Sequence, residues 1–181
     1  QYTFPDESGK DRYVVIELSQ SYVGMLDASL NVLSDHEITG MIKSLHNRGG
    51  GYHKLYFAIV ADNPFESYTS WQGINDMGSV AARQGKDIGV WLYFTGNDNH
   101  VVRLKVGLSP VSEAQAMFEA VNGIQGWDFN QVWNNTAAVW REKLSKAEIR
   151  GSSDELKTLF YTHLYHSYLV PNNATASNGV Y

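Results

Sequence analysis

The pattern of hydrophobic and polar positions changes character near residue 109. Before this point, short runs rich in β-branched and aromatic residues are separated by glycine, proline and asparagine, which is typical of strands joined by turns. We expect strands at 12–18, 30–44 with a turn at 35–37, 52–61, 88–94 and 100–108, with a polar loop at 74–86 and a hairpin connection at 96–99. The pattern predicts an antiparallel β-sandwich over residues 1–108.

After residue 109 the hydrophobic period becomes 3.6, and the sequence predicts three helices. Each has a short polar residue three positions before Glu or Gln, so that side chains can bind the free N–H groups of the first turn. The predicted pairs are Ser112 with Gln115, Asp128 with Gln131, and Ser152 with Glu155. We interpret residues 109–150 as a helical linker.

The second and third helices each carry a wide apolar face. In the second helix this face holds Phe129, Val132, Trp133, Thr136, Trp140 and Leu144. In the third it is a stripe, expected to be buried, of Leu156, Leu159, Phe160, His163, Leu164, Ser167 and Tyr168. No other segment of the sequence is predicted to pack against these two apolar faces. We therefore expect a fragment in which residues 1–108 are the C-terminal part of an N-terminal β-sandwich domain and residues 151–181 begin a helical domain.

Composition narrows the function. The 181 residues carry a net charge near −5, without basic runs, which argues against a nucleic-acid partner. No apolar run approaches the roughly 20 residues of a membrane span, so none is predicted. Cysteine is absent, which excludes disulfides and thiolate metal sites. Five Trp and eleven Tyr suit a carbohydrate binder, because sugar C–H groups stack on rings, but β-rich domains are also aromatic-rich.

Candidate chemistry is sparse. His163 and His166 are neighbours on one helix, but they lack a nearby carboxylate and the spacing of zinc proteases, so no metal site is predicted. Asp154 and Glu155 lie at a helix N-terminus, where the helix dipole favours negative charge. No acidic pair carries a specific catalytic signal.

The order of several segments along the chain is more informative about function than any of these single residues. The series comprises Tyr2-Thr-Phe-Pro5, Leu55-Tyr-Phe57, Asp62-Asn-Pro-Phe65 with Tyr68 and Trp71, Val101 to Ser109 with Ser112 and Ala114, Trp127-Asp-Phe129, Trp140 to Leu144, and Leu159 to Leu169 before Pro171-Asn172. It resembles glycoside hydrolase family 92, the exo-acting, calcium-dependent α-mannosidases. The resemblance runs from about Tyr2 to Asn172, and FYTHLYHS within residues 159–169 is its most specific element.

This resemblance implies an N-terminal β-sandwich, a helical linker and a C-terminal (α/α)6 barrel, with the active site between the domains. It implies hydrolysis of terminal α-mannosides in glycans with inversion, by a Glu acid, an Asp base and Ca²⁺, in a secreted or periplasmic enzyme. No acid in this chain matches those residues. The catalytic and calcium-binding groups are therefore expected outside it, with no catalytic or metal residue within it, and residues 1–181 alone are expected to be inactive.

By the same resemblance, the third helix is the first helix of the barrel, partnered by the remainder of the catalytic domain. Tyr165, His166 and Asn172 are the candidates for residues lining the substrate cleft. The competing interpretation is that Tyr165 and His166 only hold the helix in place.

Two other functions stay open. One is a non-catalytic carbohydrate-binding sandwich with a concave face bearing Trp71 or Trp91. The other is a structural or interaction domain whose helical tail docks on another protein.

Overall fold

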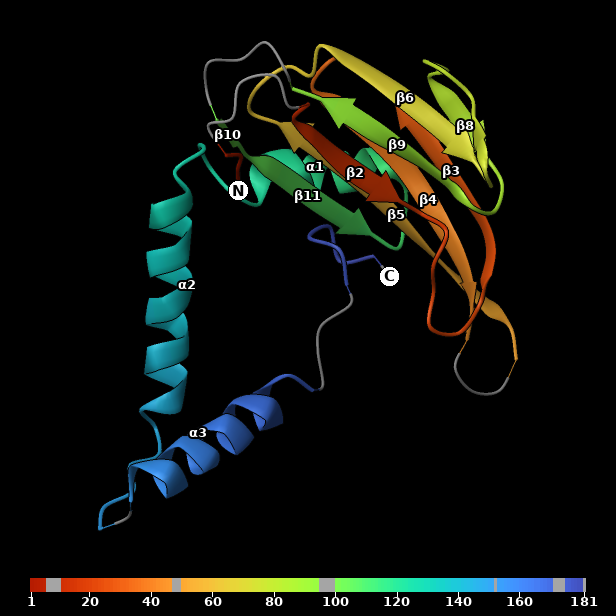
Figure 1. Ribbon diagram of the computed structural model, residues 1–181. Coiled ribbons are helices and arrows are strands. Elements are labelled where there is room, and N and C mark those ends of the chain that lie inside the picture. The colour runs from red at the N-terminus through yellow and green to blue at the C-terminus, as the bar shows by residue number, and fades with distance from the viewer. Residues whose placement is uncertain (6–10, 47–49, 95–99, 152, 171–174, 181) are drawn as a thin grey trace. The chain divides into compact units, whose positions relative to one another are not determined.

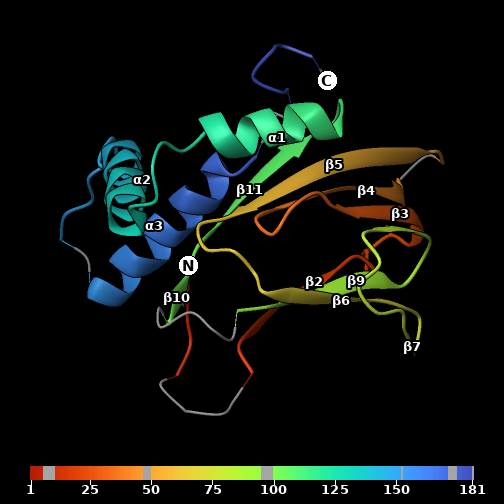
Figure 2. The same cartoon turned by 90° about the horizontal axis from the view of Figure 1, so that it is seen from above.

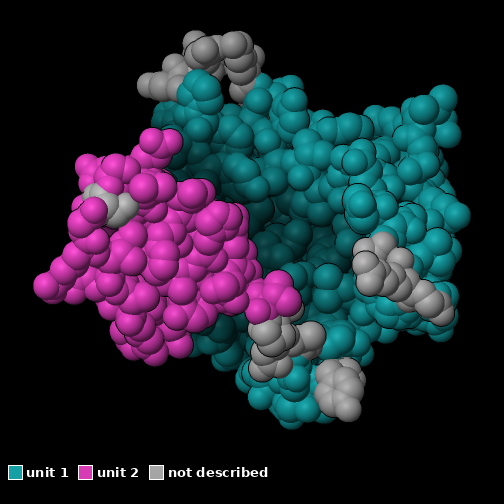
Figure 3. Space-filling view, turned by 90° about the horizontal axis from the view of Figure 1, so that it is seen from below, with its two compact units in different colours: residues 1–127, 175–181 teal, residues 128–174 magenta. Residues whose placement is uncertain are grey.

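The computed structural model describes residues 1–5, 11–46, 50–94, 100–151, 153–170 and 175–180 (Figure 1). The chain divides into two compact units, one of residues 1–127 with 175–181 and one of residues 128–174, which are coloured separately in Figure 3. The antiparallel sheets followed by three helices confirm the fold class predicted from the sequence. The domain limits at 108 and 150 stay predictions.

Two antiparallel sheets form the first unit. The five-stranded sheet has the order β11 (Leu104–Ser109), β5 (Tyr52–Ala61), β4 (Glu37–Leu45), β3 (Met25–Val32) and β8 (Ala82–Gln84). The four-stranded sheet has the order β2 (Tyr13–Glu17), β9 (Ile88–Tyr93), β6 (Ser67–Gln72) and β7 (Asn75–Asp76). A short pair joins β1 (Tyr2–Thr3) to β10 (Val101–Val102). Figure 2 shows the two sheets as separate layers.

The sequence prediction missed strands β6, β7 and β8, and also the short β1. The polar loop expected at 74–86 is wrong, because it contains β7 and β8, which join different sheets. Strand β6 was not predicted either. Its sequence, SYTSWQ, is largely polar, and its pairing with β9 stabilises it as a strand. Strands β7 and β8 are too short for period-two alternation to reveal them. The predicted hairpin connection at 96–99 lies outside the described residues.

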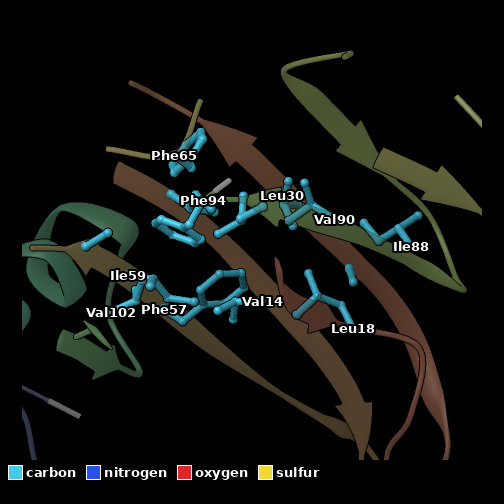
Figure 4. Close-up of a cluster of buried hydrophobic side chains, with 14 residues drawn as sticks. Val14, Leu18, Leu30, Phe57, Ile59, Phe65, Ile88, Val90, Phe94 and Val102 are labelled. Atoms are coloured by element: carbon cyan, nitrogen blue, oxygen red, sulfur yellow. The ribbon is translucent and has the colours of Figure 1, made fainter. Parts of the chain in front are cut away.

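The core lies between the two sheets and follows from alternation along their strands. In β9 the inward side chains of Ile88, Val90 and Leu92 are at most 1% exposed, and Phe94 continues the series. Figure 4 shows Ile88, Val90 and Phe94 in one cluster with Leu30 and Phe57 of the other sheet. Burial of such large apolar groups is the main stabilising term of a sandwich.

Helix α1 (Glu113–Asn122) covers the outer face of the five-stranded sheet (Figure 2). Its buried residues Ala116 and Ala120 pack against Ala58. The helix approaches closely because position 107 is glycine: a Cβ there would lie 2.0 Å from the Ala116 carbonyl oxygen. The helix that the sequence assigns to the linker is thus a packed layer of this unit.

Polar contacts hold both ends of α1. The Ser112 side chain accepts from the Gln115 N–H at 3.1 Å, which confirms the predicted cap. Toward the other end, the Glu119 carboxylate accepts from the Ser177 N–H at 2.8 Å. One turn earlier, in the first turn of α1, the Asn178 amide donates to Gln115 Oε1 at 3.0 Å. Hydrogen bonds from the Ser177 side chain, the Ser177 backbone N–H and the Gln115 side chain lower the pKa of Glu119. The segment 175–180 therefore returns to α1 after the chain has formed the second unit.

Candidate functional site

The predicted site residues belong to the second unit, a pair of helices. Helix α2 spans Phe129–Leu144 and helix α3 spans Asp154–Tyr168. The Asp128 side chain caps α2 by accepting from the Gln131 N–H at 2.9 Å, as predicted. The cap of α3 is one residue later than predicted: Ser153, in an extended backbone conformation, accepts from the Leu156 N–H at 3.3 Å. Ser152 lies outside the described residues.

The apolar stripe of α3 is only partly buried by the described residues. The expectation of a wide buried stripe is therefore wrong for this chain: Leu156 and Leu159 are more than half exposed. Partial burial falls instead on positions 157, 160, 161 and 164, at spacings typical of one narrow helix face. The physical reason is geometric, because one neighbouring helix can cover only a narrow strip of another.

Aromatic rings make the contact between the two helices. The Tyr165 ring lies 4.6 Å from the Trp140 ring of α2, at an angle of 59°. The His166 ring lies 5.7 Å from the Tyr165 ring. In the preceding turn, the Tyr161 hydroxyl donates to the Ala147 carbonyl at 3.0 Å and so fixes α3 to the segment that follows α2. Through these contacts Tyr161 and Tyr165 position α3 against α2 and the segment that follows it.

One side of α3 borders an open hollow of about 570 Å³. It is lined by Asp154, Lys157, Thr158, Tyr161, Thr162 and Tyr165. The hydroxyls of Thr158 and Thr162 donate to carbonyls one turn back, at 2.8 and 2.7 Å, so their donors are already in use. Tyr165 keeps 37% of its surface exposed. This helix face can form one wall of a cleft, but by itself it encloses nothing.

The structure brings together only part of the predicted cleft. Tyr165 borders the hollow, whereas His166 neighbours its ring without lining the hollow. Asn172 lies outside the described residues. Sequence reasoning did not single out Thr158 and Thr162. Their spacing was a usable signal, because Thr158, Thr162 and Tyr165 follow one another at four and three residues and so share one helix face.

The described residues do not fit a calcium site. Within that part of the chain, no three His, Asp or Glu side chains converge as a metal ion requires. Asp154, the acid nearest the hollow, pairs with Lys157 at 3.4 Å. We therefore derive no chemical step through a metal for this chain. Nor does any helix in the described ranges combine the length and apolar character needed to cross a membrane.

Trp71 and Trp91, the residues named for the carbohydrate-binding alternative, lie in the first unit. They occupy neighbouring strands of the four-stranded sheet, and their ring centroids are 4.2 Å apart. Tyr13 and Tyr93 form a second aromatic pair on the same sheet, at 6.1 Å. Sequence reasoning missed these tyrosines, although the alternation of Gly89, Trp91 and Tyr93 along one strand was a visible signal.

The comparisons with known proteins point to one family of glycosidases. Residues 1–109 match the sequence profile of the glycosyl hydrolase family 92 N-terminal domain, and residues 114–181 match the profile of its catalytic domain. A curated relative, an uncharacterized secreted glycosidase of Arthroderma benhamiae, is 33% identical over 96 residues, which are 50% of this chain and 12% of that protein.

Solved structures have the same fold. The GH92 family glycosyl hydrolase ccman5 superposes with a TM-score of 0.86 at 27% identity, over 98% of this chain and 24% of that one. The GH92 α-mannosidase BT3965 of Bacteroides thetaiotaomicron gives 0.81 at 21% identity, over 93% and 24%. The GH92 inverting mannosidase BT2199 of the same species gives 0.79 at 19%, over 96% and 23%.

The chain spans about a quarter of the length of these solved relatives. The two Bacteroides structures, at their low identity, support the fold alone. The family rests on the two sequence profiles, which leave only residues 110–113 unmatched. This chain belongs to glycosyl hydrolase family 92 and carries sequence of both its N-terminal and its catalytic domain.

Proposed function

We propose that this chain is part of an inverting exo-α-mannosidase that removes terminal α-linked mannose from glycans. The observation that carries the proposal is the consecutive match to both domains of family 92, in a fold shared with solved members. A secreted or periplasmic location is part of the proposal, and the word "secreted" in the name of the fungal relative supports it.

In this proposal the chain contributes a wall of the cleft, not the reacting groups. An inverting glycosidase needs two carboxyl groups roughly 6.5–9.5 Å apart, with room for water between them. We assign neither group to this chain, and we place the Ca²⁺ ligands outside it as well. Tyr165, His166 and Asn172 are proposed to line the cleft, with Tyr165 supported by its exposure beside the hollow of α3.

The exposed apolar faces of α2 and α3 are proposed to pack against the remainder of the catalytic domain. Leu159 on α3 is half exposed and Trp133 on α2 is about two-thirds exposed. Large apolar side chains gathered on helix faces in this way favour burial against further helices. Residues 1–181 alone are expected to be inactive, because the catalytic groups and the Ca²⁺ ligands are assigned outside them.

The first test measures mannose release from α-1,2-, α-1,3- and α-1,6-linked mannobiose by a longer protein that contains these residues. We expect release from at least one linkage, loss of activity in EDTA, and recovery when calcium is added. Residues 1–181 alone should release nothing. Absence of release from every linkage by folded protein with calcium would contradict the proposal. Release by the short chain would contradict the location of the catalytic groups.

A second test separates a substrate contact at Tyr165 from packing alone. The variant Tyr165→Phe keeps the ring beside Trp140 but removes the hydroxyl. If the hydroxyl bonds the sugar, kcat/KM falls about tenfold while the unfolding midpoint stays unchanged. The matched control is Tyr168→Phe, an exposed tyrosine of the same helix. Unchanged kinetics in Tyr165→Phe would leave Tyr165 as a positioning residue only.

A further inference from the structure

The outer face of the four-stranded sheet carries an ordered set of aromatic side chains. Strand register places Tyr13 beside Tyr93, and Val15 beside Trp91 and Thr69. The next row runs from Glu17 across Gly89 and Trp71 to Asp76. We call these three rows the aromatic face. The alternate residues Val14, Val90 and Leu92 point into the core, so this face is directed away from it.

The position of the Trp71 ring depends on a glycine. A Cβ on Gly89 would lie 2.1 Å from Cζ2 of Trp71, so the indole occupies the space that a side chain would fill. Gly89 is buried beneath it, although it belongs to the outer row. The Trp91 ring then lies beside Trp71, with centroids 4.2 Å apart and planes at 42°. The Trp71 indole therefore lies over the sheet surface as part of the aromatic face.

The part of the aromatic face on strand β2 is exposed to solvent. Tyr13 is 49% exposed, and its ring centroid is 6.1 Å from that of Tyr93. Val15, between the two aromatic pairs on the same edge strand, is nearly as exposed. Helix α1 lies on the opposite side of the sandwich, over the outer face of the five-stranded sheet (Figure 2). The four rings together span more than one strand spacing, which suits an extended ligand better than a single small one.

The negative charge of the aromatic face indicates which class of ligand can stack on its rings. Glu17 and Asp76 close the two ends of the row that contains Trp71, and both are exposed. These carboxylates are the ionisable side chains of that row. Glu17 Oε1 already accepts from Ser19 and Gln20, and Asp76 Oδ1 accepts from the Gly78 N–H, so the second oxygen of each carboxylate is the acceptor offered to hydroxyl groups of a ligand. The faces of the rings are also negative and attract polarised C–H groups. A ligand with hydroxyl donors, C–H faces and no negative charge complements all of these features.

We infer that the aromatic face binds a neutral glycan through stacking on Trp71, Trp91, Tyr93 and Tyr13, with Glu17 and Asp76 accepting hydrogen bonds from sugar hydroxyls. This site is separate from the cleft proposed beside α3. The choice of an α-mannan as the probe rests on the proposed function. The site itself rests on the register, the exposure and the charge of the face.

The test measures retention of the 181-residue chain in native gels containing a neutral α-mannan, an anionic polygalacturonate or no polymer. We expect retardation by the α-mannan alone. The variants Tyr13→Ala and Trp91→Ala should each weaken the apparent Kd about tenfold, by removing one stacking ring. Tyr22→Ala, at a tyrosine 97% exposed in the same unit and outside the aromatic face, serves as the matched control and should behave as the unsubstituted chain.

Circular dichroism and a cooperative unfolding transition establish that each variant is folded. Tyr13→Ala is the decisive variant, because truncating a half-exposed side chain leaves the core intact. If the short chain does not fold, the same variants in a longer protein are compared for retention on mannan and for hydrolysis of mannobiose. Retention that is absent, or equal in Tyr13→Ala and Tyr22→Ala, overturns the inference. In the longer protein, retention without hydrolysis in the presence of calcium overturns the proposed function instead.

Discussion

Because α1 packs so closely against the sheet, we expect one added methyl group at position 107 to lower the stability of the fold strongly. In Gly107→Ala, the new Cβ would lie 2.0 Å from the Ala116 carbonyl oxygen and 2.4 Å from the Ala120 backbone nitrogen. Both neighbours are helix backbone, so no side chain can rotate away. Since ordinary contacts begin near 3.4 Å, the helix must shift by about 1.4 Å or the strand must distort.

The magnitude follows from overpacking. Inserting a methyl group into a closely packed contact typically costs about 1–3 kcal/mol. We expect the upper part of this range, because a shift of α1 also loosens the buried contacts among Ala58, Ala116 and Ala120. Urea unfolding of the chain measures it: the midpoint should fall while the m-value stays constant.

Two controls make the Gly107→Ala test specific. Val106→Ala changes the adjacent residue, which is 58% exposed, and should cost about 0.5 kcal/mol or less. Adding Ala120→Gly to Gly107→Ala removes the contact with the Ala120 Cβ at 2.9 Å but leaves the shorter contact with the carbonyl oxygen. The double variant should therefore stay destabilised. Full recovery, or a Gly107→Ala midpoint equal to that of Val106→Ala, would refute the reasoning.

Two further predictions concern polar contacts of α1. In Thr39→Val, loss of the buried hydroxyl that donates to Glu113 at 2.5 Å should cost about 1–2 kcal/mol in urea unfolding, whereas Thr39→Ser should recover most of it. An equal loss in both variants would point to packing instead. The lowered pKa of Glu119 means that its contribution is complete above its ordinary pKa of 4.5 and is lost as the pH falls through the lowered value. Hydrogen exchange at the Ser177 amide should therefore accelerate in that acidic range, and Glu119→Gln should abolish this pH dependence; an unchanged pH profile in the variant would contradict the assignment.

Local sequence determined the elements whose stability depends mainly on their own residues. Period-two alternation located β9, and the side chains of Ser112 and Asp128 located the starts of two helices, because a cap bonds groups only three residues away. The order of motifs along the chain also indicated family 92, which both family profiles confirm. None of these inferences needed to know which segments meet in space.

Tertiary structure decided everything that depends on segments meeting. Strand β8 exists because residues 82–84 find a free edge beside β3, and their own sequence carries no strand pattern. The closeness of α1 to β11 depends on Gly107 facing a helix, which its neighbours in the sequence do not reveal. Likewise, register placed Trp71 over Gly89, and so assembled the aromatic face from three strands. Local propensity acts over a few residues, whereas pairing and packing are set by the free energy of the whole fold.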